Sequence, residues 1–366
     1  MKIGILKELK NGEKRVAISP KIVRSLVDKG FECFIEENAG ILAQFTNSDF
    51  EESGAKIKTN NEIFELADIL VKINPFEKKE IQKLKNGQIT ISQLFHLSNT
   101  DRIEEMAKKG VSAFSLDAMP RISRAQDMDV LSSQNNLAGY KSVILGANEI
   151  PKIFPLMMTA AGTITPARVL IFGVGVAGLQ AIATAKRLGA IVEATDIRKE
   201  TKEQTESLGG KFISVENNED EGNSVYAKEA SDEYKQKQKE AVEESLFKAD
   251  LVITTAQVPG RKAPVLITKD QVEKMKNGAV IIDLAAEQGG NCGYSKLDEI
   301  VIVNGVKIIG ISMSPVSVSY NASELFGKNV FNFLVHLTDE NGFKWELDEE
   351  ITDGTLITHK NQIRKQ

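Results

Sequence analysis

The feature that most constrains the fold is a regular alternation of short apolar runs with segments of helical spacing, which occurs twice. The first series fills the N-terminal third of the chain, and the second begins at Arg168. Strands that alternate with helices predict right-handed βαβ units and parallel sheets. The predicted strands are 2–6, 32–36, 68–73, 88–93 and 111–115 in the first series, and 168–172, 191–195, 211–215, 250–256, 279–285 and 306–311 in the second.

The two series predict an α/β protein with two Rossmann-like, doubly wound parallel-sheet domains. The 366 residues are enough for two full hydrophobic cores. Residues 323–337 have helical spacing and follow the completed second series, so we expect this helix to pack back on the first domain. The first domain is then discontinuous and comprises residues 1–132 and 312–366. The second domain comprises residues 133–311 and begins with a long connecting segment.

Composition and charge exclude several classes of function. The net charge is −5 without a concentrated basic block, which argues against a nucleic-acid partner. Two cysteines, Cys33 and Cys292, cannot build a disulfide framework, and no Cys/His cluster indicates a metal site. The N-terminus lacks an apolar signal-peptide core, and the apolar run around Gly173 is about half the length that a membrane span needs. We therefore expect a cytoplasmic protein without a membrane span of its own.

Three glycines in G-x-G-x-x-G spacing stand between a predicted strand and a predicted helix. Gly173 permits a tight turn, Gly175 lets the backbone approach a pyrophosphate, and Gly178 lets the helix and strand pack closely. The helix, which starts near Val176, offers free N–H groups and a partial positive charge to phosphates. A turn that only packs a helix on a strand can have the same spacing, so the glycines alone do not establish a nucleotide site.

An acidic residue supports the nucleotide interpretation. Asp196 lies 18 residues after Gly178, at the end of the next predicted strand. A carboxylate there accepts hydrogen bonds from the adenosine ribose and repels a 2′-phosphate. Arg198 could favour NADP(H), but the carboxylate at the strand tip should dominate. The sequence therefore predicts an NAD(H) site made by Gly173, Gly175, Val176, Gly178, Asp196, Ile197 and Arg198.

The polar segment 120–140 has a plain interpretation as a solvated loop and a helix start, with Asp129 or Ser132 as the cap. Several motifs together, however, resemble the NAD(H)-binding alpha-1 components of proton-translocating nicotinamide nucleotide transhydrogenases. The resemblance extends from the N-terminus to about residue 330. The motifs are RISRAQDMDVLSS (121–133), GVGVAGLQAIATAKRLGA (173–190), TKEQTESLGGKFI (201–213), PVLIT (264–268) and IIDLAAEQGGNC (281–292).

The resemblance implies roles for two loops. In the family, an Arg-Gln-Asp loop folds over the nicotinamide and its ribose; here that implies Arg121, Gln126 and Asp129, followed by Ser132. The family's mobile loop matches VYAKE (225–229), which makes Tyr226 the counterpart of a tyrosine that closes over the nucleotide. Val225 stands where relatives commonly have glycine. The surrounding segment 216–244 is highly charged, and its residues predict a solvated loop running into a helix.

The resemblance also implies an activity and its partners. NAD(H) bound to this chain would exchange hydride directly with NADP(H) on a partner subunit, coupled to proton translocation through membrane-embedded subunits. Such a transfer needs aligned nicotinamides and excluded water rather than an acid, a base or a metal. The family further implies a homodimer that is peripheral at the inner face of the cell membrane through its partners. The stretch 312–326 departs from the pattern because it lacks the expected Pro-x-Arg.

Two other functions remain open. The same family includes alanine dehydrogenase, and Arg15, Lys72 and His96 stand at the positions that match its 2-oxo acid site. The plain interpretation is that the three are inherited scaffold residues. The Arg-Gln-Asp loop favours transhydrogenase, because alanine dehydrogenases have a largely apolar sequence there, while Glu287 is compatible with either. The third possibility is a non-catalytic module that senses the redox state of NAD(H).

Overall fold

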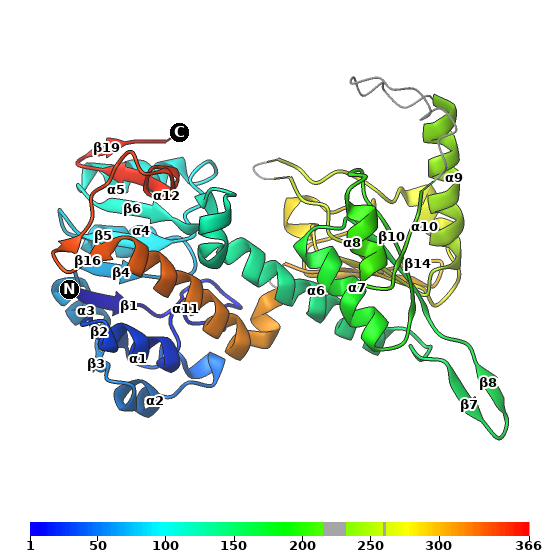
Figure 1. The fold of residues 1–366 in the computed structure, drawn as a ribbon, viewed down its shortest axis with the longest axis horizontal. Coiled ribbons are helices and arrows are strands. Elements are labelled where there is room, and N and C mark those ends of the chain that lie inside the picture. Colours follow the sequence, from blue (N-terminus) through cyan, green and yellow to red (C-terminus); the bar gives the residue numbers. More distant parts are fainter. Residues whose placement is uncertain (215–231, 259–260, 313, 366) are drawn as a thin grey trace. The chain divides into compact units, whose positions relative to one another are not determined.

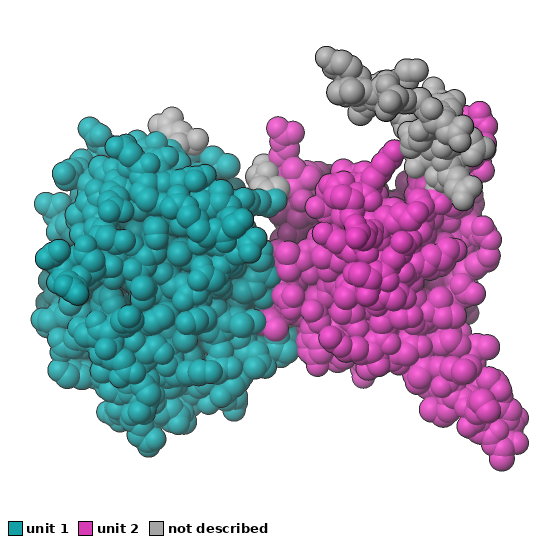
Figure 2. Space-filling model, in the orientation of Figure 1, with its two compact units in different colours: residues 1–134, 315–366 teal, residues 135–314 magenta. Residues whose placement is uncertain are grey.

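The computed structural model describes residues 1–214, 232–258, 261–312 and 314–365, and the chain forms two compact units (Figure 1). Unit 1 contains residues 1–134 and 315–366, and unit 2 contains residues 135–314 (teal and magenta in Figure 2). The first boundary lies within helix α6 (Val130–Glu149). The boundaries expected from the sequence, after residues 132 and 311, lie two and three residues before these.

Unit 1 is built on an eight-stranded sheet with the order β19-β18-β6-β5-β4-β1-β2-β3. Strands β1 to β6 run parallel, and their order is that of a doubly wound Rossmann fold, which confirms the predicted fold class. The chain reverses its direction of travel across the sheet between β1 and β4. The six strands are β1 (Lys2–Ile5), β2 (Glu32–Glu36), β3 (Lys56–Lys58), β4 (Ile69–Val71), β5 (Ile89–Ser92) and β6 (Ser112–Ser115).

Helices cover this sheet and include one from the C-terminal part of the chain. The predicted helix at 323–337 is observed as α11 (Ser319–His336), and it packs against α1 within unit 1 as expected. Its apolar side chains Phe326, Val330 and Phe333 are fully buried in the unit 1 core. The other helices of unit 1 are α1 (Pro20–Asp28), α2 (Asn47–Glu52), α3 (Asn60–Leu66), α4 (Lys78–Lys83), α5 (Thr100–Lys108) and α12 (Glu350–Thr355).

The tail of the chain corrects the expectation of a purely parallel sheet. Strand β18 (Leu356–His359) pairs antiparallel with β6, and β19 (Gln362–Ile363) pairs antiparallel with β18. All four residues of β18 are buried, so the tail covers an edge of β6 that would otherwise be unpaired. A small antiparallel pair, β16 (Thr338–Asp339) and β17 (Gly342–Phe343), lies between α11 and this tail in the sequence.

Unit 2 is built on a seven-stranded sheet with the order β11-β10-β9-β12-β13-β15-β14. All strands are parallel except β14, which forms a hairpin with β15 and was not predicted. The predicted strand 211–215 is only two residues long in the structure. The strands are β9 (Arg168–Phe172), β10 (Ile191–Thr195), β11 (Lys211–Phe212), β12 (Leu251–Thr254), β13 (Val280–Asp283), β14 (Ile300–Val303) and β15 (Val306–Gly310).

The helices of unit 2 follow its strands in the expected alternation. They are α7 (Val176–Arg187), α8 (Thr201–Ser207), α9 (Asp232–Lys248) and α10 (Lys269–Glu273). The apolar strands β12 and β13 are buried along their whole length, as expected for central strands of a parallel sheet that is covered on both faces.

A separate hairpin in unit 2 was not predicted. Strands β7 (Met157–Thr159) and β8 (Gly162–Ile164) pair only with each other and project from the unit (Figure 1). Every residue of the two strands is exposed. In the sequence the hairpin occupies the end of what was expected to be a plain connecting segment.

Within the described ranges of the chain, no helix is both long enough and apolar enough to cross a lipid bilayer.

Candidate functional site

The turn between β9 and α7 is held by two of the three glycines. Gly173 has a φ of +91°, in the left-handed region that favours glycine, and its N–H donates to the carbonyl of Thr195 at 2.9 Å. A Cβ at Gly178 would lie 1.9 Å from the Gly173 carbonyl oxygen, so a side chain there would collide with backbone. These two glycines are therefore required by the turn itself, whether or not a nucleotide binds.

Gly175 differs from the other two glycines. It has an ordinary φ of −83°, and a Cβ placed there would meet no protein atom within 4 Å. It is the N-cap residue of α7, yet no side chain caps this helix, so the first N–H groups of α7 point to a space that the protein leaves open. A pyrophosphate fits such a place, because the N–H groups and the helix dipole stabilise negative charge. The absent side chain at Gly175 thus has a ligand reason and no packing reason.

Asp196 lies at the carboxyl end of β10 and bonds to this turn. Its Oδ2 accepts a hydrogen bond from the Val174 N–H at 2.7 Å, and its side chain is only 6 % exposed. The Arg198 guanidinium donates to both carboxylate oxygens, each at 3.0 Å. Burial opposes ionisation of Asp196, but the hydrogen bonds from Arg198 and Val174 outweigh it, so the pKa of Asp196 lies below its ordinary value.

The neighbouring Ile197 is 99 % exposed, so no contact inside the protein explains an isoleucine at this position. An apolar side chain beside the ribose-binding acid is suited to cover an apolar or aromatic part of a ligand. The structure therefore brings together every described residue of the predicted NAD(H) site: Gly173, Gly175, Val176, Gly178, Asp196, Ile197 and Arg198.

Three polar residues that support this turn were missed from the sequence. The Thr255 hydroxyl donates to the Gly173 carbonyl at 3.0 Å. The fully buried Asn291 accepts from the Ala256 N–H at 3.0 Å and donates to the Ala256 carbonyl at 2.9 Å. Asp283 in turn accepts from the Asn291 N–H at 2.7 Å. The available signal was the position of Thr255 and Asp283 at the ends of apolar strands, where polar side chains reach the ligand edge of a parallel sheet.

The predicted nicotinamide loop lies in unit 1, where it is firmly anchored. It contains the short 3₁₀ helix η3 (Ser123–Met128), whose Ala125 and Met128 are buried in the unit 1 core. The side-chain amides of Asn329 and Asn332 on α11 both donate to the Asp127 carbonyl, at 2.8 and 3.0 Å. The loop is therefore a fixed part of the unit rather than a loose connection.

The four described site residues of this loop fall into two groups. Arg121 and Gln126 are exposed, and within the described ranges their side chains make no hydrogen bond or ion pair. Asp129 instead accepts from the Ser132 N–H at 3.0 Å and from the Ser132 hydroxyl at 2.6 Å, which caps the start of α6. The plain interpretation of Asp129 and Ser132 as a helix cap is thus met, while Arg121 and Gln126 remain free to contact a ligand. Tyr226 and Val225 lie outside the described residues.

The residues expected for a 2-oxo acid site have partners inside unit 1. All three guanidinium nitrogens of the buried Arg15 are engaged, two with Glu13 at 2.8 and 2.7 Å and one with Gln134 at 2.8 Å. The Lys72 ammonium is buried and lies 2.8 Å from both carboxylate oxygens of Glu80. Neither cation is available to bind the carboxylate of a substrate.

The third of these residues, His96, lies on a loop after β5. Its Nδ1 is buried and has no hydrogen-bond partner among the described residues. The preceding Phe95 has a φ of +45°, which is unusual for a residue with a bulky side chain. Glu287, which the sequence left compatible with both enzymes, is exposed on the loop after β13.

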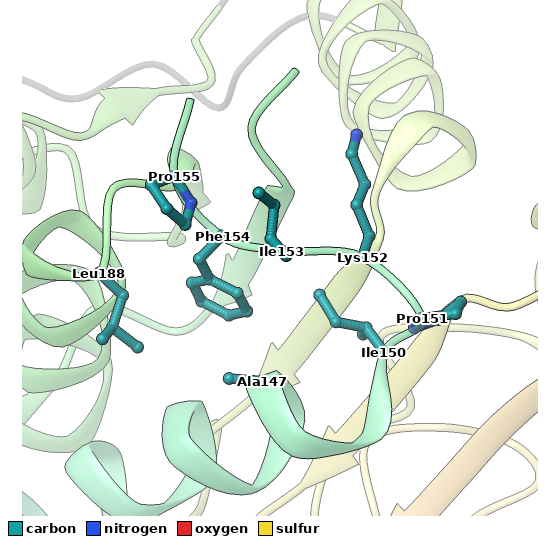
Figure 3. A pocket seen from close by; sticks show the side chains of 8 residues that line it. All are labelled: Ala147, Ile150, Pro151, Lys152, Ile153, Phe154, Pro155 and Leu188. Atoms are coloured by element: carbon teal, nitrogen blue, oxygen red, sulfur yellow. The ribbon is translucent and has the colours of Figure 1, made fainter. Parts of the chain in front are cut away.

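Unit 2 also carries an open apolar pocket of about 570 Å³ at the foot of the β7–β8 hairpin. Figure 3 shows Phe154 and Ile150 on its wall and Lys152 extending away from them. The residues that line it are Ala147, Ile150, Pro151, Lys152, Ile153, Phe154, Pro155 and Leu188. Among the residues that the structure describes, no group of three or more His, Cys, Asp or Glu side chains could hold a metal ion.

Comparison with known proteins places this geometry in context. Residues 4–138 match the family model of the alanine dehydrogenase/PNT N-terminal domain, and residues 142–366 match that of the C-terminal domain. The chain is 50% identical over 374 aligned positions to the first of the chains that make up NAD(P) transhydrogenase subunit alpha in Rhodospirillum rubrum, covering 99% of this chain and 97% of that one.

Two further comparisons separate the branches of the family. The crystal structure of a transhydrogenase from Sinorhizobium meliloti superposes with a TM-score of 0.91 at 40% identity and covers 99% of this chain and 100% of that one. Alanine dehydrogenase 1 of Staphylococcus aureus is only 28% identical, with 100% of this chain and 95% of that protein covered.

Proposed function

Because this chain belongs to the alanine dehydrogenase/PNT family, we propose that it is the NAD(H)-binding subunit of a transhydrogenase. The single observation that carries the proposal is the open space at Gly175, beside the uncapped start of α7 and the buried carboxylate of Asp196. The N–H groups of α7 bind the pyrophosphate, and Asp196 binds the adenosine ribose. Both features lie within unit 2.

The bound cofactor supplies the hydride, and the residues of the chain position it. Arg121 and Gln126 are exposed and unpaired within the described ranges, and they hang from a loop that Ala125 and Met128 anchor in the core. We assign to them the nicotinamide end of NAD(H), together with Asp129, while Tyr226 excludes water. Holding the reacting carbons at a fixed distance and angle is the whole task, because hydride transfer between nicotinamides needs no acid or base.

The rest of the enzyme lies on other polypeptides in this proposal. NADP(H) is bound by a partner subunit, and protons cross through membrane-embedded partners that keep this subunit at the inner face of the cell membrane. The Rhodospirillum rubrum relative is named as only a portion of subunit alpha, which supports a division of the enzyme among several chains.

The alanine dehydrogenase alternative is disfavoured by the charges in unit 1. Reductive amination of a 2-oxo acid requires cations that are free to bind the substrate's carboxylate and carbonyl. Glu13 and Glu80 neutralise Arg15 and Lys72 within hydrogen-bond distance. The purified chain should therefore show no oxidation of NADH that depends on pyruvate and ammonia, and robust turnover that His96→Ala abolishes would instead support the dehydrogenase.

Hydride transfer in a reconstituted complex tests the proposal and separates it from a non-catalytic sensing module. The chain is mixed with an NADP(H)-binding transhydrogenase domain, and transfer from NADPH to an NAD analogue is followed by stopped flow. Gln126→Ala should slow single-turnover transfer on the order of a hundredfold while NADH affinity changes little, because a misplacement of about 1 Å at the reacting carbon has that cost. No transfer by the unmodified chain would leave the sensing module as the better explanation.

Two variants control this experiment. Asp127→Ala removes an exposed side chain next to Gln126, on a residue whose carbonyl alone anchors the loop, so transfer should be unaffected. Asp129→Asn retains an acceptor for the Ser132 N–H and so preserves the cap of α6, whereas Asp129→Ala does not. Slow transfer by both Asp129 variants would indicate a ligand contact; slow transfer by Asp129→Ala alone would indicate only the cap.

We also propose that the chain is a homodimer in which the β7–β8 hairpins are exchanged. A two-stranded hairpin is marginally stable alone, yet this one projects from unit 2 with Met157, Met158 and Ile164 exposed. The apolar pocket begins at its foot, where Pro155 lines the wall. A two-fold axis allows the hairpin of each copy to cover the pocket of the other, because such interfaces are self-complementary.

Sedimentation of two variants tests this interface. Met158→Asp places a charge on the most exposed apolar side chain of the hairpin and should shift the protein toward monomer, whereas Ala160→Asp at the exposed turn should not. A dimer of unchanged stability in Met158→Asp would show that the hairpin is not the interface.

A further inference from the structure

The carboxylate of Asp196 already has as many hydrogen-bond donors as it can accept. Oδ2 accepts from the Val174 N–H at 2.7 Å and from Arg198 Nη2 at 3.0 Å. Oδ1 accepts from the Arg198 N–H at 2.9 Å and from Arg198 Nε at 3.0 Å. Since a carboxylate oxygen accepts about two hydrogen bonds, the ribose hydroxyls of a nucleotide cannot bind Asp196 until the guanidinium leaves.

The guanidinium is held in a way that lets it leave. The Arg198 side chain is 50 % exposed, and Asp196 is its sole hydrogen-bonding partner in the described part of the chain. The backbone of Arg198 stays fixed, because its carbonyl accepts from the Thr201 hydroxyl at 2.7 Å. An ion pair this exposed contributes little to stability, so the side chain can swing out around a fixed backbone at small cost.

We propose that Asp196 and Arg198 form a latch that sets the choice between NAD(H) and NADP(H). The latch rests on the proposed nucleotide site of unit 2 and adds a specificity-determining residue to it. When closed, Arg198 competes with the ribose hydroxyls for Asp196. In the same state Asp196 withholds from the solvent the cation that would otherwise bind a 2′-phosphate. Asp196 therefore excludes NADP(H) in two ways, by repelling the 2′-phosphate and by occupying Arg198.

The two functions of the latch give opposite expectations for the two residues. Arg198→Ala frees the carboxylate and should tighten NADH binding about two- to fivefold, the range that an exposed ion pair allows. Asp196→Ala frees the guanidinium, so it should weaken NADH binding and tighten NADPH binding by about tenfold or more. The NADPH gain should be lost in the double variant, because it depends on Arg198. It should also decrease at high salt, since it is a contact between charges.

Equilibrium titrations of the full chain with NADH and with NADPH, at low and high salt, measure this cycle. Lys199→Ala is the matched control, because it removes an exposed positive charge one residue further along without touching Asp196. Arg198→Lys should give intermediate values, since an ammonium cannot bind both carboxylate oxygens as a planar guanidinium does.

The outcomes distinguish the latch from the site on which it rests. An NADPH gain that persists in the double variant, weaker NADH binding in Arg198→Ala, or an equal response in Lys199→Ala would overturn the latch and leave the nucleotide site standing. If the unmodified chain bound neither nucleotide, the proposed function would fail and the latch with it.

Discussion

The two units share one strand order, and they use the end of that sheet differently. In each, the chain changes direction next to its first strand, β1 in unit 1 and β9 in unit 2, where doubly wound folds bind ligands. In unit 2 only residues 173–175 connect the first strand to the first helix, and they are rich in glycine. In unit 1 the connection is the longer segment 6–19, and the helix begins with Pro20, which has no N–H to offer a phosphate.

What occupies the space also differs. Unit 1 fills its strand ends with its own charges: Glu13 binds Arg15, Glu80 binds Lys72, and the buried Glu8 accepts from the Ile73 N–H at 2.6 Å. Burial raises the pKa of Glu8 above its ordinary value, despite the nearby Lys72 charge. Unit 2 leaves its helix start uncapped and open at Gly175. The strand order thus provides a place for a ligand, and the local turn decides whether a ligand or the protein's own side chains occupy it.

The largest expected effect comes from breaking a filled site in unit 1. Glu80→Leu leaves the Lys72 ammonium buried without a counter-charge and should lower the free energy of unfolding by about 3–5 kcal/mol. The double variant Lys72→Met, Glu80→Leu should recover most of that loss. Urea unfolding followed by the fluorescence of Trp345, the single tryptophan of the chain and located in unit 1, measures it. A loss below about 1 kcal/mol in Glu80→Leu would mean that the pair is not a structural filling.

A smaller effect, also confined to unit 1, depends on pH. Glu349 accepts from the N–H groups of Ile351 and Thr352 and lies 3.0 Å from His336 Nε2. Burial opposes its ionisation, but these bonds outweigh burial and lower its pKa from 4.5 to about 2. The folded state then binds fewer protons, so the stabilisation is present above pH 4.5 and is lost as the pH falls toward 2.

The matching substitution is Glu349→Gln. At pH 7 it should cost about 2 kcal/mol in the Trp345-monitored unfolding, after allowance for a side chain that is 16 % exposed. At pH 2 the variant and the unmodified chain should unfold alike. An equal cost at both pH values would show that the carboxylate charge is not the source.

The smallest change in stability should come from the open site of unit 2, where binding alone responds. Gly175→Ala should fold normally, because its methyl group meets no protein atom, yet it should weaken NADH binding by about tenfold, or about 1.4 kcal/mol. Gly178→Ala is the matched contrast, since its methyl group would collide with the Gly173 carbonyl and lower the melting temperature. NADH titration and thermal unfolding of both variants give the test, and unchanged NADH affinity in Gly175→Ala would remove the pyrophosphate from this turn.

The strands and the glycine turn could be predicted because their signals are local. Strands that are buried on both faces are continuous apolar runs, and the roles of Gly173 and Gly178 follow from their spacing. Strand β14 had a local signal that was overlooked: Asn304 and Gly305, both with positive φ, form the tight turn of its hairpin with β15. Strand β18 had none, since it forms only where the tail meets β6.

The partners of the site residues could be predicted less well than their positions. Asp196 and Arg198 are both expected near a ribose, but their mutual bond depends on side-chain geometry that the sequence does not contain. The same holds for Thr255 and Asn291, which are far from Gly173 in the sequence and reach its turn only through the fold. The filling of unit 1 by Glu13 and Glu80 was likewise hidden, because the identity of a cation does not reveal its counter-ion.

The discontinuity of unit 1 has a consequence for how the chain is made. Its first 134 residues leave the ribosome without α11, whose Phe326 and Phe333 complete their core, and without β18, which covers the edge of β6. At ribosomal speed these partners follow on the order of tens of seconds later, after the whole of unit 2 has been synthesised and can fold. During synthesis, unit 2 is therefore the self-sufficient folding module, and the N-terminal half-domain is the stage at which a chaperone would be needed.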